Sequence, residues 1–122
     1  MIKPTLLFAF TTLSVALLSA MSATPARADD DAVFAPARGV VCDRYVCADE
    51  KGISFGLTES YLGNEAQNRL LSQGDFDLTE FTFTNGIFCD VKERVCREDR
   101  YYGADGRPSG AVSEKYTAML FG

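Results

Sequence analysis

Four cysteines are the residues of this chain whose type and spacing could do chemistry. They form two local pairs, Cys42 with Cys47 and Cys89 with Cys96. Each pair sits in the same short pattern of a glycine, two apolar residues, Cys-Asp, a polar gap and a second cysteine. Such pairs form a redox centre, a metal site or two disulfides, and only the first two of these would make the cysteines chemically active.

The gaps of four and six residues inside the two pairs favour disulfides. Neither gap is the two-residue gap of a thioredoxin-like redox motif. A four-cysteine zinc site usually shows gaps of two to four residues, and the six-residue gap of the second pair lies outside this range. We therefore predict a framework of two disulfides, for which three connectivities exist.

Local pairing is our preferred connectivity, and the long-range pairings stay open. In a hairpin with a two-residue tip, Cys42 and Cys47 lie opposite each other at a Cα separation that a disulfide accepts. Cys89 and Cys96 close a slightly longer hairpin of the same kind. On a loop-entropy model, a local pair stabilises by roughly 2–2.5 kcal/mol and a long-range pair by roughly 4 kcal/mol. Stability therefore favours long-range pairing, whereas proximity and the repeated pattern favour local pairing.

Other catalytic chemistry has little support in the composition. The chain contains no histidine, which excludes histidine-based nucleophilic catalysis. Paired carboxylates remain, but a glycosidase places two of them across a deep cleft, and the domain is small. We predict no enzymatic activity and no cofactor. The acidic loops are weak candidates for a calcium site, although their spacing does not match an EF-hand. The residues concerned are Asp75, Asp77, Glu98, Asp99 and Asp105.

Residues 1–28 have the pattern of a secretory signal peptide. A positive start at Lys3 precedes a mostly apolar run over residues 6–21, and Ala26-Arg27-Ala28 follows as the cleavage motif. The mature protein is then periplasmic or secreted, in a compartment where disulfides form. No second long apolar run follows, so we expect no membrane contact after cleavage.

The mature chain is acidic, and this suggests a class of partner. Residues 29–122 contain 10 basic and 17 acidic residues, a net charge of −7. Such a charge disfavours nucleic acid and favours a basic protein partner. Candidate contact residues are Asp43 and Asp90, which follow the first cysteine of each pair. Tyr101 and Tyr102 are also candidates, because neighbours on a strand face opposite sides and a one-faced sheet cannot bury both.

The elements that position these residues indicate one α+β domain. Residues 29–38 are predicted to be a flexible acidic leader, and residues 39–122 a single disulfide-stabilised domain. Its predicted fold is a small antiparallel sheet of disulfide-clipped hairpins with two short helices. Each hairpin is followed by an acidic cluster, a glycine and a stretch that ends in a helix, which suggests a weak internal duplication.

The strands are predicted from alternation and turn signals. Residues 53–58 alternate as an extended segment. Residues 78–84 also alternate, with Phe81 and Phe83 on one side. Asn85-Gly86 is a strong hairpin signal, and residues 87–91 form the return strand.

The helices are predicted from capping residues. Thr58 is expected to cap a helix over residues 59–73. Gly63-Asn64 is expected to break this helix, with Asn64 capping its second part. Ser113 is expected to cap a terminal helix.

Several stretches together resemble a known family. They are "GVVCDRYVCADEKGIS", "GDFDLTEFTFTNGIFCD" and "CREDRYYGADGRPSG". The chain is similar to the Fels prophage protein-like family, the YcgJ-type small exported proteins of Gram-negative bacteria, from about Gly39 to Gly122. The resemblance implies a periplasmic or secreted protein of one domain, and it assigns no catalytic residues.

Three functional hypotheses follow. The first is a non-catalytic module that binds a basic protein, for example a basic cell-wall muramidase. The second is a divalent-cation binder that uses the acidic loops. The third, and the least favoured, is a thiol oxidoreductase that uses Cys42 and Cys47.

Overall fold

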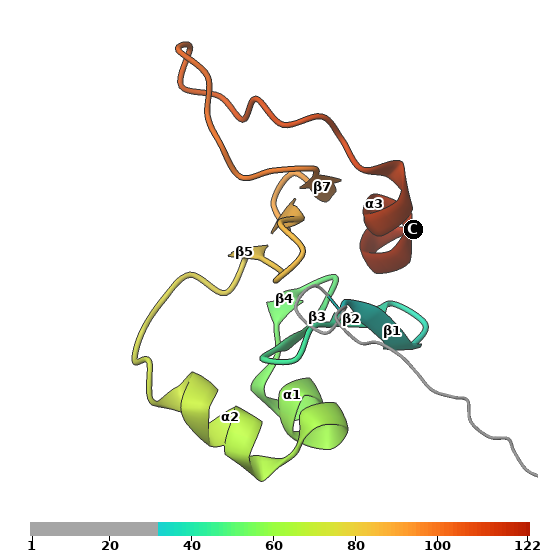
Figure 1. The fold of residues 1–122 in the computed structure, drawn as a ribbon, viewed down its shortest axis with the longest axis vertical. Helices are drawn as coiled ribbons and strands as arrows, with labels where there is room; N and C mark the ends of the chain where they lie inside the picture. Colours follow the sequence, from blue (N-terminus) through green and yellow to red (C-terminus); the bar gives the residue numbers. More distant parts are fainter. Residues whose placement is uncertain (1–31) are drawn as a thin grey trace, which may run out of the picture.

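A computed structural model describes residues 32–122, so the predicted signal peptide and the start of the acidic leader lie outside the described residues. A group of strands followed by helices occurs twice along the chain (Figure 1). In chain order the elements are β1 (Phe34–Ala37), β2 (Val40–Cys42), β3 (Cys47–Asp49), β4 (Gly52–Ile53), α1 (Phe55–Leu62), α2 (Asn64–Leu71), β5 (Glu80–Thr82), β6 (Phe88–Asp90), β7 (Val95–Arg97) and α3 (Glu114–Phe121).

The strands form two small antiparallel sheets. The first has the order β1-β2-β3-β4 and the second β5-β6-β7. A backbone hydrogen bond of 2.9 Å from Ile53 N–H to the carbonyl oxygen of Leu78 joins the last strand of the first sheet to the approach to the second. The predicted α+β fold of disulfide-clipped hairpins is confirmed.

Both disulfides join neighbouring cysteines, as the hairpin geometry favoured. Cys42 is bonded to Cys47 and Cys89 to Cys96, with Cα–Cα distances of 4.1 Å and 4.0 Å. In each pair the two residues lie directly opposite each other on adjacent strands. All four side chains are fully buried. The long-range connectivities are therefore absent.

The two faces of the first sheet have different neighbours. Successive side chains on a strand point to opposite faces. Cys42 and Cys47 face one way, where they pack with Leu57 and Leu62 of α1. Val41 faces the other way and belongs to the main core.

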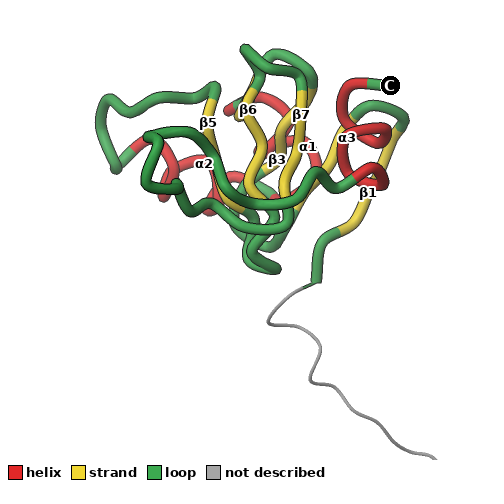
Figure 2. The backbone as a smooth tube through the Cα atoms, turned by 90° about the horizontal axis from the view of Figure 1, so that it is seen from above, coloured by secondary structure: helices red, strands yellow, loops and turns green. Residues whose placement is uncertain are grey.

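That main core lies between the two sheets. The second sheet contributes Phe81, Cys89 and Cys96, which share one face, and α3 contributes Leu120. The cysteine face of the second sheet therefore packs toward the face of the first sheet that carries no cysteine. The two hairpins are stacked head to tail, with α1 and α2 at one end and the second sheet toward the other (Figures 1 and 2).

Two of the predicted extended segments need correction. Residues 34–37, which we placed in a flexible leader, form β1 and pair with β2. Residues 53–58 are mostly helical, because α1 begins at Phe55. The Ser54 side chain accepts a hydrogen bond from Leu57 N–H and so caps the helix. Thr58 is therefore not a cap but a buried residue inside α1.

The predicted break at Gly63 is confirmed, and residues 32–122 therefore contain three helices instead of two. Gly63 has a φ of 103°, a conformation that favours glycine, and it ends α1 and starts α2. The prediction that Asn64 caps the second part is wrong, because α2 has no side-chain cap. Ser113 caps α3 as expected, since its hydroxyl accepts from Tyr116 N–H. Phe81 and Phe83, which the alternation placed on one side, are both buried.

Candidate functional site

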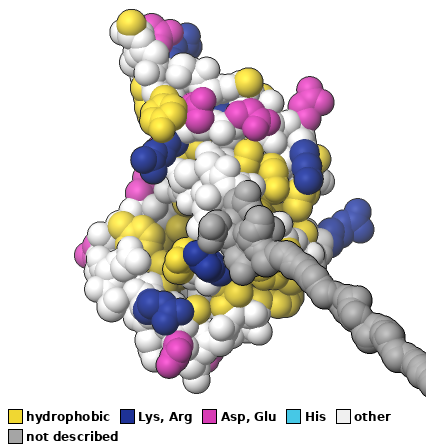
Figure 3. Space-filling view, in the orientation of Figure 1, with side chains coloured by type: hydrophobic (Ala, Val, Ile, Leu, Met, Phe, Trp, Pro, Cys, Tyr) yellow, Lys and Arg dark blue, Asp and Glu magenta, His cyan; other side chains and the backbone are white. Residues whose placement is uncertain are grey.

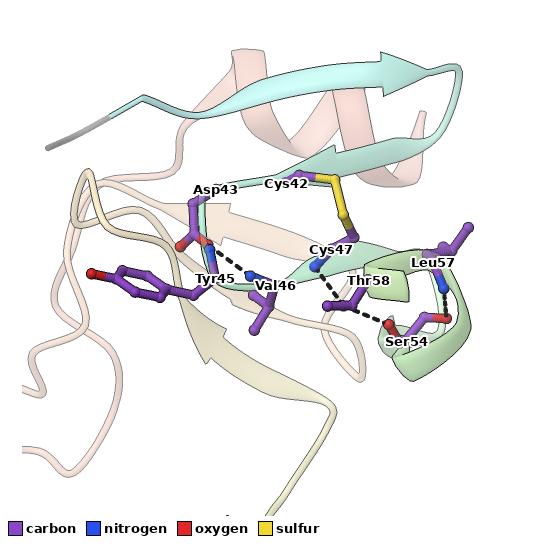
Figure 4. Close-up of a disulfide and its surroundings, with 8 residues drawn as sticks. All are labelled: Cys42, Asp43, Tyr45, Val46, Cys47, Ser54, Leu57 and Thr58. Carbon is purple, nitrogen blue, oxygen red and sulfur yellow. Dashed lines mark hydrogen bonds between the residues drawn. A yellow bond between two sulfur atoms is a disulfide. The ribbon is translucent and has the colours of Figure 1, made fainter. Parts of the chain in front are cut away.

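The aspartate of each Cys-Asp pair closes its own hairpin loop. Asp43 Oδ1 accepts hydrogen bonds from the backbone N–H groups two and three residues further on, at 2.7 Å and 3.0 Å (Figure 4). Asp90 Oδ1 accepts from the same two positions of its loop, at 2.8 Å and 3.3 Å. Asparagine and aspartate favour such local turns, so the repeated Cys-Asp is a structural device.

A threonine ties each hairpin to the helix that follows it. Thr58 Oγ1 accepts from Cys47 N–H at 2.9 Å (Figure 4), and Thr117 Oγ1 accepts from Cys96 N–H at 2.8 Å. The serine four residues before each threonine donates its N–H to the carbonyl oxygen of the same cysteine, at 2.9 Å and 2.7 Å. The internal duplication thus extends to individual hydrogen bonds.

Asp43 does not lie on an exposed contact surface, which corrects our prediction for this residue. Its exposed fraction is 2%. Its second oxygen, Oδ2, accepts from Thr84 N–H at 3.0 Å and so links the first hairpin to the turn between β5 and β6. A carboxylate with three N–H donors is fully engaged inside the protein. Asp90 is only partly buried.

The two halves differ in the connection from the second cysteine to the following helix. Six residues separate Cys47 from Ser54, whereas sixteen separate Cys96 from Ser113. We call residues 98–112 of the longer connection the arm. It projects from the end of the molecule beyond the second sheet (Figure 1).

Backbone hydrogen bonds hold the arm in a hairpin-like shape. Glu98 N–H donates to the carbonyl oxygen of Ala111 at 2.7 Å, near the base. Further out, Ser109 N–H donates to the Tyr101 carbonyl oxygen at 2.9 Å, and Tyr102 pairs with Pro108. The arm is therefore an ordered part of the fold.

Two adjacent aromatic side chains are exposed on the arm. Tyr101 has an exposed fraction of 63% and Tyr102 of 54%. Both lie outside the core, whereas the alternation argument required this of only one of them. Acidic and basic side chains are interspersed over the face in Figure 3, with several acidic ones in the half that carries the arm.

The base of the arm also covers one face of the second sheet. Phe88 and Arg97 share the face of the second sheet that points away from the first sheet. The Arg97 guanidinium donates to the Gly110 carbonyl oxygen at 2.9 Å, and Arg97 pairs with Val112. In a stack of repeated units the last unit needs a cap. The base of the arm takes this position on the second sheet.

The candidate metal ligands have local partners instead of a shared centre. Asp77 accepts from both the N–H and the hydroxyl of Thr79, and these bonds, the hydroxyl first, lower the pKa of Asp77. Asp99 and Asp105 each accept from the backbone N–H two residues further on. Within residues 32–122, no three or more His, Cys, Asp or Glu side chains gather to hold a metal ion.

Comparison with known proteins places these features in a family. A family model described as YcgJ protein matches residues 33–121. The chain belongs to the YcgJ family. A relative from Escherichia coli strain K12, named "Uncharacterized protein YcgJ", is 52% identical over 93 residues, which is 76% of each chain. No solved structure matches. The YcgJ-type resemblance noted from the sequence is therefore confirmed.

The YcgJ-family match spans β1, both hairpins and the arm. No helix in residues 32–122 has the length and apolar character needed to cross a membrane. In this YcgJ-family chain, our sequence reasoning missed the role of Thr58 and Thr117, whose hydroxyls accept from the N–H groups of the second cysteines. The signal that would have revealed them is the Ser-x-x-x-Thr spacing that begins at Ser54 and again at Ser113.

Proposed function

We propose that this YcgJ-family protein is a non-catalytic module that binds another protein through its arm. One observation carries the proposal: Tyr101 and Tyr102 are more than half exposed on an ordered, projecting segment that the first half of the molecule lacks. Tyrosine is enriched among the residues that dominate binding energy. It offers a large, rigid contact area at a low cost in conformational entropy.

The partner that fits best is a basic protein, such as a cell-wall muramidase in the periplasm. Residues 32–122 contain 14 acidic and 10 basic residues, and three further aspartates stand at positions 29–31. Complementary charge accelerates encounter and makes it sensitive to salt. Because the charges are interspersed on the face seen in Figure 3, the tyrosines are expected to supply most of the affinity.

The two alternative functions have less support. A thiol oxidoreductase needs a disulfide that its substrate reaches, whereas all four cysteines have an exposed fraction of 0%. A calcium site needs several converging oxygen ligands. Each of Asp77, Asp99 and Asp105 instead bonds a backbone N–H of its own turn.

The test compares three forms of residues 29–122. These are the wild type, the double variant Tyr101→Ser/Tyr102→Ser, and the control Tyr61→Ser, which removes a tyrosine that is 42% exposed on α1. Each form is used for capture from periplasmic extract at low and high salt, with mass spectrometry as the readout. Affinity for the purified partner is then measured.

We expect the wild type and the control to capture the same basic protein, and the double variant to bind it about 30-fold or more weakly. Equal binding by all three forms would show that the arm is not the contact surface. Capture that persists unchanged in high salt would contradict the electrostatic part of the proposal. The absence of any partner at either salt concentration would count against protein binding itself.

A further inference from the structure

A groove of about 500 Å³ lies where the first hairpin meets α3, and neither Tyr101 nor Tyr102 lines it. Its size falls within the range of ordinary ligand sites. The turn between β1 and β2, the end of β3, α1 and the last turn of α3 all contribute to it. The lining used below comprises Arg38, Val40, Asp49, Glu50, Leu57 and Met119.

The lining of this groove includes both apolar and acidic residues. Val40 and Leu57 belong to the apolar cluster around the Cys42–Cys47 disulfide. Asp49 and Glu50 contribute two carboxylates at the end of β3. The last turn of α3 adds the partial negative charge of a helix C-terminus. A group that suits this lining has an aliphatic stem and a positive head.

The protein already places one such group beside the groove. Arg94 lies over the Phe121 ring at 5.3 Å from its centroid. Its guanidinium donates to the Phe121 carbonyl oxygen at 3.0 Å and approaches Glu50 at 3.5 Å. Arg94 does not line the groove itself. The same end of α3, together with Glu50, thus accepts a guanidinium from outside the groove.

We propose that this groove binds a lysine or arginine side chain of a peptide segment. The aliphatic stem lies on Val40, Leu57 and Met119, and the positive head lies between Asp49 and Glu50. Arg38, on the lining formed by the β1–β2 turn, donates to a carbonyl oxygen of the peptide. This site is independent of the tyrosines and does not rest on the function proposed for the arm.

The first experiment is an NMR titration of residues 29–122 with N-acetyl-lysine N-methylamide. N-acetyl-norleucine N-methylamide is the matched probe, because it keeps an aliphatic stem and lacks the ammonium group. We expect the lysine probe to shift the signals of Asp49, Leu57 and Met119. The norleucine probe is expected to bind at least about fivefold more weakly than the lysine probe. Equal shifts from both probes, shifts located elsewhere, or no shifts would overturn the proposal.

Three variants then sharpen the assignment. Asp49→Asn is expected to weaken binding of the lysine probe about fivefold while keeping the oxygen that accepts from Lys51 N–H. Glu65→Gln, which removes the same charge from an exposed position on α2, is expected to leave binding unchanged. Undiminished binding by Asp49→Asn, or an equal loss in Glu65→Gln, would contradict the site.

The third variant separates this proposal from the one for the arm. Tyr101→Ser/Tyr102→Ser is expected to bind the lysine probe as the wild type does. A loss of probe binding in this variant would place the site on the arm and overturn the groove. Loss of partner capture with retained probe binding would support both proposals separately.

Discussion

The hairpin closed by Cys42–Cys47 and the one closed by Cys89–Cys96 use the same parts in different surroundings. Each has an aspartate that caps its loop and a threonine that accepts from the second cysteine. In the first hairpin the aspartate and the threonine are 2% and 0% exposed. In the second hairpin, both corresponding residues are only partly buried.

This difference follows from the head-to-tail stacking. The first sheet is covered on one face by α1 and on the other by the main core. The second sheet has its cysteine face in that core, while Arg97 on its other face contacts the base of the arm. The local hydrogen bonds are therefore equivalent, but their contribution to stability depends on how much water each site excludes.

The largest expected effect is the loss of a disulfide, and it should be similar in the two halves. Replacing Cys42 and Cys47 together by alanine, or Cys89 and Cys96 together, should lower the free energy of unfolding by about 2–4 kcal/mol in each case. The sequence separations of 5 and 7 give nearly equal loop entropies. Urea denaturation followed by circular dichroism measures both. A loss of unfolding free energy for only one pair would show that the two disulfides are not equivalent.

Substitution of the two aspartates should change the free energy of unfolding by clearly different amounts in the two halves. Asp43→Ala removes three hydrogen bonds in a buried site and should cost about 3 kcal/mol of unfolding free energy. Asp90→Ala removes two bonds in an exposed loop and should cost about 1 kcal/mol. Denaturant midpoints of the two variants provide the comparison. Equal costs would show that burial of Asp43 adds nothing.

The threonines should show the same order with a smaller difference. Thr58→Val leaves the N–H of Cys47 without its acceptor in a fully buried site, at a cost of about 1.5 kcal/mol. Thr117→Val does the same to Cys96 in a less buried site, at about 1 kcal/mol. Amide hydrogen exchange of the two cysteines is the direct readout. A larger increase in the exchange rate of Cys96 in Thr117→Val than of Cys47 in Thr58→Val, each relative to the wild type, would reverse the predicted order.

The smallest effect concerns the segment in front of β5. The Thr79 hydroxyl lowers the pKa of Asp77 below its ordinary value of 3.8, with smaller contributions from the Thr79 N–H and Lys92. The residue of the first half that corresponds to Thr79, 47 residues earlier, is Ala32. Because alanine has no hydroxyl group, the first half lacks this contact. Thr79→Val should move the Asp77 pKa upward, as read by carboxyl-carbon NMR titration.

The sign of the linked stability follows from that direction. A carboxyl whose pKa is lower in the folded state stabilises the protein above its unfolded pKa, and the contribution disappears as the pH falls through the folded pKa. Thr79→Val should therefore reduce the loss of stability on acidification below about pH 4. An unchanged Asp77 pKa in the variant would show that the hydroxyl bond is not its cause.

Local signals allowed much of this fold to be predicted. The spacing of the cysteines, the Asn85-Gly86 turn and the Ser113 cap each depend on neighbours within a few residues. The start of α1 was misplaced because Ser54 and Thr58 are both good capping residues, and only the fold shows that Ser54 caps. Here tertiary contacts decide between two local signals of similar strength.

The surroundings of the candidate sites could not be predicted in the same way. The burial of Asp43 depends on Thr84, 41 residues away. The groove depends on α3 lying against the first hairpin, which no local pattern encodes. The exposure of one ring of Tyr101 and Tyr102 was predictable, because adjacent residues on a strand point to opposite faces and only one face is buried. The exposure of the second ring depends on how the arm projects from the second sheet.

The order of the disulfides along the chain has a consequence for how the protein matures. Each cysteine is bonded to the next one in sequence, and 41 residues separate Cys47 from Cys89. A chain that enters an oxidising compartment from its N-terminus completes the first bond before the third cysteine arrives. When the cysteines pair in this order, each thiol reacts with the next one in the sequence, and no mispaired disulfide has to be exchanged. In such a compartment, oxidation in the order of the sequence would suffice to form the native pairs.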